Sequence, residues 1–326
     1  MISLLKPVSL GPLKLKNNLA LAPMAGITNA AFRILAAEGG AGLVVTEMVS
    51  AESIKYGNKK SFKMLELLPG ERPAAIQLFG ADPASMALAA QAAERAGADL
   101  VDINAGCPVK KVRRSGAGAE LMLSPMLLSD IISRMVKSVK VPVTVKFRVG
   151  LVSGESLGPL LARVSEEAGA SAITLHGRPA SQFHTGPVDL EAMSATAAAV
   201  KIPVFGNGGV ENAAGARAIL ATGCAGVAIG RAAVFNPALF AEIAAGLSGQ
   251  EGVAVTSAAR MRLFLRFLEL NAGIYGEEHG LARARKLVGY WLKGLPGAAG
   301  ARGAFMSLKT LKEAEDLLIQ YTEDPK

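Results

Sequence analysis

The sequence predicts a (β/α)8 TIM barrel followed by a small all-helical C-terminal domain. Short apolar runs rich in β-branched residues alternate with Ala- and Leu-rich segments of helical period between residues 19 and 229. Each run is apolar on both faces, which is typical of strands buried on both sides in a parallel sheet. Gly/Ala signals precede several runs, as in GGAGLVVTE (39–47) and TGCAGVAIGR (222–231). This regular alternation favours a closed barrel.

Eight strands are predicted, and their starts lie 22 to 43 residues apart. They cover residues 19–22, 43–46, 74–78, 100–104, 143–147, 172–176, 204–207 and 226–229. Segments 83–97 and 125–139 are two of the helices expected between them. An open, doubly wound sheet is the alternative. Such sheets usually contain fewer strands, and no GxGxxG motif follows the first strand here.

The pattern changes after about residue 245, so we expect one domain over residues 1–245 and a second over 246–326. Residues 247–255 (LSGQEGVAV) are interpreted as a linker. From Ser257, a candidate helix cap, the sequence has helical period with glycine-rich breaks and no strand-like alternation. It predicts three or four helices.

Composition excludes several classes of protein. Of the 326 residues, 51% are hydrophobic and 19% charged, which is too apolar for a disordered chain. No stretch of 18 residues is free of charge, and the N-terminus lacks the pattern of a signal peptide. Two cysteines cannot form a disulfide framework, which fits a reducing compartment. We expect a monomeric cytoplasmic protein with no membrane association and no metal site.

The net charge is +8, from 35 Lys and Arg against 27 Asp and Glu. Much of the excess positive charge lies in residues 257–312, which contain ten Lys and Arg but only three Glu. A basic helical segment on a protein rich in core residues is compatible with a polyanionic partner, although many soluble proteins are equally basic.

The active groups of a TIM barrel lie at the carboxyl ends of its strands, so the residues that end each predicted strand are candidate site residues. A polar group ends nearly every strand, and a full ring of this kind favours an active site. The candidates are Ala22, Pro23, Met24, Gln77, Asn104, Cys107, Lys146, Arg148, His176, Arg178, Asn207, Gly208, Gly209, Gly230 and Arg231.

The turns after the last two strands, GNGGV (206–210) and AIGRA (228–232), are rich in glycine and lead into helices. Backbone N–H groups in such turns can approach a phosphate closely, and this is the common phosphate site of these barrels. The turns therefore predict a phosphate-bearing ligand. The alternative is that the glycines only make the turns.

Two further candidates allow more than one interpretation. An inward Lys146 must be paired or bound to a ligand, because burying its charge alone is costly. It could form a Schiff base or donate to an electron-rich ring, and the alternative is an outward, solvated lysine. His176 could bind phosphate, act as an acid or base, or be a hydrogen-bonded core residue.

The two cysteines are predicted to differ in role. Cys107 lies on a loop followed by VKKVRR, whose cations are Lys110, Lys111, Arg113 and Arg114. Nearby cations lower the pKa of a thiol and also bind phosphates, so Cys107 is a candidate reactive group, with an ordinary loop cysteine as the alternative. Cys224 precedes the last strand at the opposite end of the barrel, where we expect it to pack in the core.

These residues resemble the tRNA-dihydrouridine synthases, most closely the bacterial B-type members. The matching segments are APMAGITNAAFR, TEMVSA, QLFG, DINAGCPVKKV, TVKFRVG, ITLHGR, IPVFGNGGV, GVAIGRAA and RARKLVGYWLKGLPGA. They run from residue 22 to residue 298 in family order, and DINAGCPVKK is the most specific.

The resemblance implies an enzyme in which FMN, reduced by NADPH, gives a hydride to C6 of a uridine in tRNA while an acid protonates C5. Cys107 matches the proton donor, and Lys146 matches the lysine beside the flavin. The other positions that match the flavin site are Ala22, Pro23, Met24, Gln77, His176, Asn207, Gly208, Gly209, Gly230 and Arg231.

The resemblance also implies a substrate uridine in the D-loop, with position 17 as the expected target. The residues expected to bind the tRNA are Asn104, Lys110, Lys111, Arg113, Arg148, Arg178, Arg283 and Arg285. One alternative is an FMN barrel oxidoreductase that acts on a small molecule, such as a dihydroorotate dehydrogenase or an ene-reductase. The other is a barrel that binds RNA without catalysis.

Overall fold

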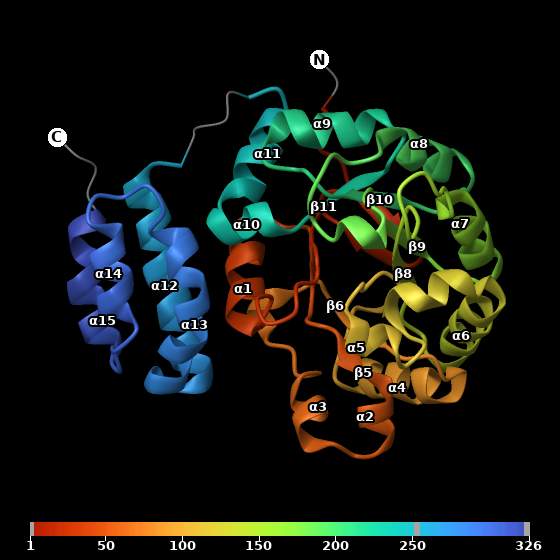
Figure 1. Cartoon of the computed structure of the whole chain (residues 1–326), viewed down its shortest axis with the longest axis horizontal. Helices are drawn as coiled ribbons and strands as arrows, with labels where there is room; N and C mark the ends of the chain where they lie inside the picture. The colour runs from red at the N-terminus through yellow and green to blue at the C-terminus, as the bar shows by residue number, and fades with distance from the viewer. Residues whose placement is uncertain (1–2, 251–254, 323–326) are drawn as a thin grey trace.

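The computed structural model describes residues 3–250 and 255–322. Its larger part is a closed ring of parallel strands surrounded by helices (Figure 1). The ring strands are, in order, β3 (Leu19–Leu21), β4 (Leu43–Val45), β6 (Ala74–Phe79), β7 (Leu100–Asn104), β8 (Val143–Arg148), β9 (Ala172–His176), β10 (Val204–Asn207) and β11 (Gly226–Ile229). Pairing of β11 with β3 closes the ring. The predicted barrel is confirmed, and each predicted strand agrees with an observed one to within one residue.

The barrel helices alternate with the strands as predicted. They are α1 (Ala30–Glu38), α4 (Pro83–Arg95), α6 (Pro125–Ser138), α7 (Gly158–Glu167), α8 (Leu190–Ala198), α9 (Ala213–Ala221), α10 (Arg231–Phe235) and α11 (Leu239–Leu247). Local sequence sets their starts: the Asp82 side chain accepts the N–H of Ser85, and Pro83 occupies the first turn of α4, where no N–H is needed. The helices that lie between two strands return the chain to the amino end of the barrel, so the strands they connect are parallel; these helices are α1, α4, α6, α7, α8 and α9.

The second strand of the barrel is interrupted. β4 ends at Val45, and the short β5 (Val49–Ser50) pairs with the carboxyl end of β6. The chain then forms α2 (Ala51–Lys55) and α3 (Lys59–Lys63), which project from the barrel beside its mouth (Figure 1).

An N-terminal hairpin, which the sequence analysis did not predict, closes the amino end of the barrel. β1 (Val8–Leu10) pairs antiparallel with β2 (Leu13–Leu15) across a turn at Gly11, whose φ is 58°. Leu10 and Leu15 are buried in one cluster with Leu100 and Phe205, residues near the start of their strands. The barrel is therefore closed at one end and open at the other.

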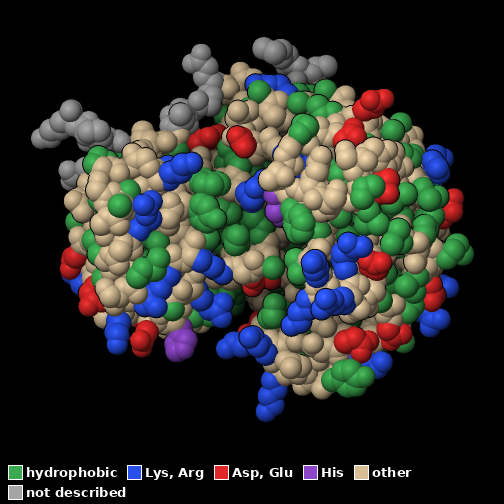
Figure 2. Space-filling model, in the orientation of Figure 1, with side chains coloured by type: hydrophobic (Ala, Val, Ile, Leu, Met, Phe, Trp, Pro, Cys, Tyr) green, Lys and Arg blue, Asp and Glu red, His purple; other side chains and the backbone are tan. Residues whose placement is uncertain are grey.

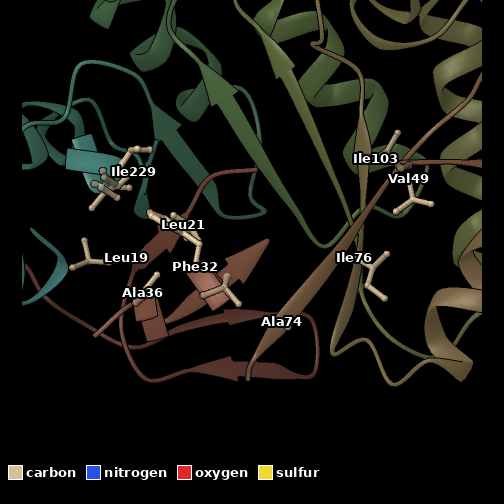
Figure 3. Close-up of a cluster of buried hydrophobic side chains, with 14 of the residues drawn as sticks. Leu19, Leu21, Phe32, Ala36, Val49, Ala74, Ile76, Ile103 and Ile229 are labelled. Carbon is tan, nitrogen blue, oxygen red and sulfur yellow. The ribbon is translucent and has the colours of Figure 1, made fainter. Parts of the chain in front are cut away.

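A larger apolar cluster lies between the strands and the surrounding helices. Figure 3 shows part of it, with Leu19 and Leu21 of β3, Phe32 of α1 and Ile76 of β6. These positions alternate with inward-facing ones such as Ala20, because successive side chains of a strand point to opposite faces. This alternation explains why the strands read as apolar on both faces.

Four helices follow the barrel within the described residues: α12 (Ser257–Tyr275), α13 (Glu277–Trp291), α14 (Ala298–Phe305) and α15 (Leu311–Leu318). The cap predicted at Ser257 is wrong by one residue. The Thr256 side chain accepts the N–H of Ala259, since its extended backbone directs the hydroxyl to the first turn. The boundary expected at 245/246 falls within the last turn of α11, and the linker expected at 247–255 lies partly outside the described residues.

The C-terminal helices pack against α1 of the barrel. Asn29 at the start of α1 donates to Asn271 of α12 at 3.0 Å, and both side chains are buried. The rings of Phe32 and Phe267 meet edge to face at 6.0 Å. In the chain as described, none of the helices is long and apolar enough to cross a bilayer.

Candidate active site

The barrel interior changes from apolar to polar toward the carboxyl ends of the strands. Leu100 lies at the apolar end of β7, and Asp102 and Asn104 follow it on the same face because side chains alternate. Buried or half-buried polar side chains gather at this open end, which we call the barrel mouth. They are Gln77, Asp102, Asn104, Thr144, Lys146, Arg148, His176, Arg178 and Asn207.

Lys146 points inward and has a defined partner. Its Nζ donates to Asn207 Oδ1 at 3.1 Å, and Asn207 Nδ2 donates to the Ala228 carbonyl at 2.8 Å. Burial, followed by the charge of Arg148, lowers the pKa of Lys146 to about 7. The outward, solvated alternative is therefore excluded, and the lysine can hold or release a proton near neutral pH.

His176 is buried at the end of β9. Its Nδ1 accepts the backbone N–H of Arg178 at 3.1 Å, so the proton of the neutral ring lies on Nε2. Burial and the nearby charges of Lys146 and Arg148 lower the pKa of His176 far below its ordinary value. The imidazole is thus a neutral donor at physiological pH.

A cradle of glycines and arginines lies beside His176. A Cβ on Gly208 would approach Val188 to 2.9 Å and Arg178 to 3.3 Å, and Gly208 and Gly209 both have positive φ. Within the described residues neither Arg178 nor Arg231 has a carboxylate within salt-bridge distance, and burial, followed by the charge of Arg231, lowers the pKa of Arg178. Glu211 acts on Arg178 only from beyond salt-bridge distance. Close backbone approach and two guanidinium groups without a salt-bridge partner among the described residues fit an anion such as a phosphate.

Cys107 lies on the loop after β7 and is half-buried. Its N–H donates to Asn104 Oδ1 at 2.9 Å. A thiolate at Cys107 would raise the pKa of both Lys146 and Arg148, so the sulfur lies within reach of two cationic groups. The loop cysteine therefore faces an electropositive mouth.

Arg148 links two loops of the mouth. Its Nε donates to the Gly106 carbonyl at 2.8 Å, and its Nη1 donates to the Phe183 carbonyl at 2.8 Å. Nη1 also lies within hydrogen-bond distance of the carbonyls of Arg178 and Pro179. Arg148 thus joins the Cys107 loop to the loop after β9.

Cys224 is buried, as predicted for a packing residue. Its sulfur accepts the Thr222 hydroxyl at 3.3 Å, and burial raises the pKa of the thiol.

The predicted basic residues outside the mouth fall into two groups. Lys110 and Lys111 of α5 (Lys110–Arg113) are exposed, as is Arg283, whose guanidinium lies 4.1 Å from the centre of the Tyr275 ring. Arg113 is paired with Glu120 at 2.8 Å. The half-buried Arg285 donates to the Leu308 carbonyl at 3.4 Å, so it faces the interior of the helical part rather than solvent. Figure 2 shows Lys and Arg on both sides of the hollow between the two parts.

A basic projection that was not predicted from the sequence lies beside the mouth, and we call it the α2–α3 arm (residues 51–63). Lys59, Lys60 and Lys63 are exposed, and within the described residues none has a carboxylate within salt-bridge distance. Tyr56 at its tip is 78% exposed. The signal was present, because KYGNKKSFK (55–63) combines four lysines with two aromatic rings.

Two groups in the mouth were also missed. Asp102 could have been found from the period of two along β7, which places it on the same face as Asn104. His184 lies on the loop after β9, and its ring centre is 5.9 Å from that of His176. Burial and the charge of Arg148 lower the pKa of His184 to about 4. The conformation of the loop after β9 brings His184 close to His176, and no sequence pattern predicts that conformation.

Comparison with known proteins identifies the family. The family model described as Dihydrouridine synthase (Dus) matches residues 20–324. The chain belongs to the dihydrouridine synthase family. It is 39% identical over 304 residues to the tRNA-dihydrouridine synthase B of Pseudomonas syringae pv. tomato, covering 93% of this chain and 90% of that protein. It is 35% identical to a probable tRNA-dihydrouridine synthase of Rickettsia bellii, covering 96% and 97%.

The barrel of this dihydrouridine synthase family member also occurs in solved structures of other proteins. A structure titled TcOYE with pHBA has a TM-score of 0.59 at 13% identity, covering 76% of this chain and 94% of that one. A morphinone reductase mutant in complex with tetrahydroNAD has a TM-score of 0.58 at 15% identity, covering 76% and 92%. At these identities the likeness concerns the fold alone.

Proposed function

We propose that the protein reduces uridine to 5,6-dihydrouridine in tRNA, with FMN as cofactor and NADPH as reductant. One observation carries the proposal: the anion cradle of Arg178 and Arg231, the inward Lys146 and the Cys107 loop converge on one barrel mouth. The match to the dihydrouridine synthase family supports the same conclusion. We further propose a cytoplasmic monomer with its catalytic domain over residues 1–245 and a tRNA-binding domain over 246–326.

The mouth residues fit FMN. The glycine turns with Arg178 and Arg231 would hold its phosphate, and the neutral His176 would donate from Nε2. Gln77 and Lys146 lie deeper in the mouth, where they would contact the ring together with Ala22, Pro23 and Met24, which follow β3. Bound FMN would supply the hydride that adds to C6 of the uracil.

The protein's own groups would complete the addition across the C5–C6 double bond. The Cys107 thiol would give its proton to C5, so that one hydride and one proton saturate the bond. Protonated Lys146 would stabilise negative charge on the reduced ring. Asn104 would bind a uracil carbonyl through the N–H that faces only the sulfur of Met48, because its oxygen already accepts two backbone N–H groups.

The tRNA would lie over the hollow between the barrel and the C-terminal helices. Lys110 and Lys111 carry exposed positive charge on α5, and Arg283 carries it on α13. We add the α2–α3 arm to this surface, because three of its lysines have no salt bridge among the described residues and its Tyr56 is exposed. Such groups suit RNA phosphates and an unpaired base. The base must leave the stack to reach the mouth, which is least costly in a loop such as the D-loop. We propose position 17 as the target.

A reconstituted reaction tests the proposal. The purified protein is expected to release FMN on denaturation and to form dihydrouridine in an unmodified tRNA transcript when NADPH is present. Cys107→Ala should keep FMN and its reduction by NADPH, yet form dihydrouridine at least 100-fold more slowly, since general acids contribute about 10²–10⁴-fold. Absence of flavin, or oxidation of dihydroorotate or reduction of enones in place of tRNA, would contradict the proposal.

A further inference from the structure

A chain of side-chain hydrogen bonds begins at a buried carboxyl group inside the barrel. Asp102 accepts from Gln77 Nε2 at 2.7 Å through one oxygen and from Thr144 Oγ1 at 2.6 Å through the other. All three side chains are buried. Gln77 Oε1 in turn accepts from Asn104 Nδ2 at 2.9 Å. These hydrogen bonds therefore run from Asp102 of β7, through Gln77 of β6, to Asn104 at the mouth end of β7.

At the mouth, these hydrogen bonds end at the loop that carries Cys107. Asn104 Oδ1 accepts the backbone N–H of Cys107 at 2.9 Å and that of Gly106 at 3.2 Å. The remaining N–H of Asn104 faces the sulfur of Met48 at 3.7 Å. This is the one polar hydrogen of the Asn104 amide that a ligand in the mouth could use.

The two ends of the chain impose the same orientation on both amides. A backbone N–H can only donate, so the Asn104 oxygen must face Gly106 and Cys107. A carboxylate can only accept, so the Gln77 nitrogen must face Asp102, which leaves its oxygen for Asn104. If Gln77 turned over, two N–H groups would face each other and an oxygen would face a carboxylate. Without the acceptor at Asp102, nothing would require the Gln77 nitrogen to face Asp102.

We propose that Asp102 is a positioning residue that fixes the Gln77 amide and, through it, holds Asn104 as a hydrogen-bond donor beside the Cys107 loop. This inference rests on the proposed function, in which Asn104 binds a uracil carbonyl and Cys107 donates the proton. Asp102 itself touches neither. Its effect should therefore appear in kcat, whereas the KM for tRNA depends on the basic surface and should stay unchanged.

Four variants separate orientation from charge and packing. Asp102→Leu removes the acceptor, and we expect kcat for dihydrouridine formation to fall about tenfold with KM for tRNA unchanged. Asp102→Asn should keep most of the rate, because its oxygen can accept from Gln77 while its nitrogen donates to the Thr144 hydroxyl. Thr144→Val alone should also be mild. The double variant Asp102→Asn with Thr144→Val leaves the nitrogen of the new amide without a partner, so nothing fixes the direction of that amide. Its kcat should fall about tenfold, far more than the two single losses combined.

A second measurement does not depend on activity. Hydrogen exchange of the Gly106 and Cys107 amides should be slow in the wild-type holoenzyme and in Asp102→Asn, and at least tenfold faster in Asp102→Leu and the double variant. Asn18→Leu is the matched control, since Asn18 is buried and the change removes its hydrogen bonds to the Leu4 and Ala225 carbonyls at the closed end of the barrel. It should lower thermal stability and leave kcat and both amides unchanged.

The outcomes distinguish this inference from the proposed function. If the wild-type enzyme forms no dihydrouridine, the proposed function fails. Hydrogen exchange of the Gly106 and Cys107 amides would still show whether Asp102 orders this loop through Gln77 and Asn104. Equal losses in Asp102→Asn and Asp102→Leu would overturn the inference in favour of the charge itself. Additive effects of Asp102→Asn and Thr144→Val, or exchange that follows global stability in every variant, would also overturn it.

Discussion

The buried and half-buried side chains of the barrel mouth carry more positive than negative charge. Lys146, Arg148 and Arg178 lie together there, and Asp102 is the carboxyl group whose charge acts on Lys146. Burial raises the pKa of Asp102, while the hydrogen bonds from Thr144 and Gln77 and the charge of Lys146 favour its carboxylate form. An anionic ligand would balance the excess, which supports a phosphate-bearing cofactor in the mouth.

The lowered pKa of Lys146 predicts how the stability of the flavin-free protein depends on pH. The pKa falls from 10.5 in the unfolded chain to about 7 in the folded one, mainly because of burial. Below pH 7 both states are protonated and the cost of the buried charge is complete. Above pH 7 the folded protein alone loses the proton, so its stability rises with pH by up to about 1.4 kcal/mol per unit.

Lys146→Met isolates this effect. Its free energy of unfolding, measured by denaturant titration, should exceed that of the wild type at pH 6.5, and the difference should shrink by pH 9. Parallel pH curves for the two proteins would contradict a lysine that titrates near neutral pH.

The rule that active groups end the strands located Lys146, His176 and Asn207 from the sequence, because a strand's period fixes which face a side chain takes. The same rule identified Arg148 but not its contacts. Those contacts are carbonyls of Gly106 and Phe183, and their directions depend on loop conformations that no period describes. His184 was missed for the same reason.

At the scale of elements, the C-terminal helices are held together by stacked aromatic rings. Trp291 is fully buried, with its ring centre 5.1 Å from that of Phe264 and 6.1 Å from that of Phe267. Trp291→Ala should lower the free energy of unfolding by about 3–5 kcal/mol in a denaturant titration.

Trp291→Phe is the comparison for this prediction. Among the described residues the buried Trp291 Nε1 has no hydrogen-bond partner, so replacing the indole by phenyl loses no bond to them and keeps the stacking. It should be clearly less destabilising than alanine. Equal losses would show that ring stacking contributes little.

The α2–α3 arm makes a separate prediction about tRNA binding. Replacing Lys59, Lys60 and Lys63 by alanine should weaken binding and reduce the slope of log K against log salt by about 2 to 3, since each phosphate contact contributes about 0.7–0.9. Filter binding or anisotropy at several salt concentrations measures it.

The control removes the same charge from the other end of the barrel. Lys137, Lys140 and Lys201 are exposed and precede β8 and β10 at their amino ends. Their replacement by alanine should leave both the affinity and the slope near wild type. Equal effects of the two triple variants would mean that net charge, and not the arm, governs binding.

The strands of the barrel could be predicted because each is a clear apolar run between Gly/Ala signals. The N-terminal hairpin was missed because its strands, VSL and LKL, are only three residues long. The Gly11-Pro12 turn between them was the available signal. The α2–α3 arm follows an interruption of the second strand, which a simple strand–helix alternation does not anticipate.

For the whole molecule, the contacts between α1 and α12 join the barrel and the C-terminal helices into one surface. Arg266 of α12 pairs with Glu38 of α1 at 2.8 Å, in addition to the buried Asn29–Asn271 bond. Basic side chains on both parts then border one hollow (Figure 2). Chemistry at the mouth and binding of a large polyanion can therefore act on the same substrate.

Mapping dihydrouridine at nucleotide resolution tests the central claim most directly. In tRNA from a strain that lacks the gene, we predict loss of dihydrouridine at position 17 of the D-loop. The wild-type gene should restore it, and a gene carrying Cys107→Ala, expressed at the same level, should not. A map that is unchanged by the deletion, or restored equally by both genes, would contradict the account.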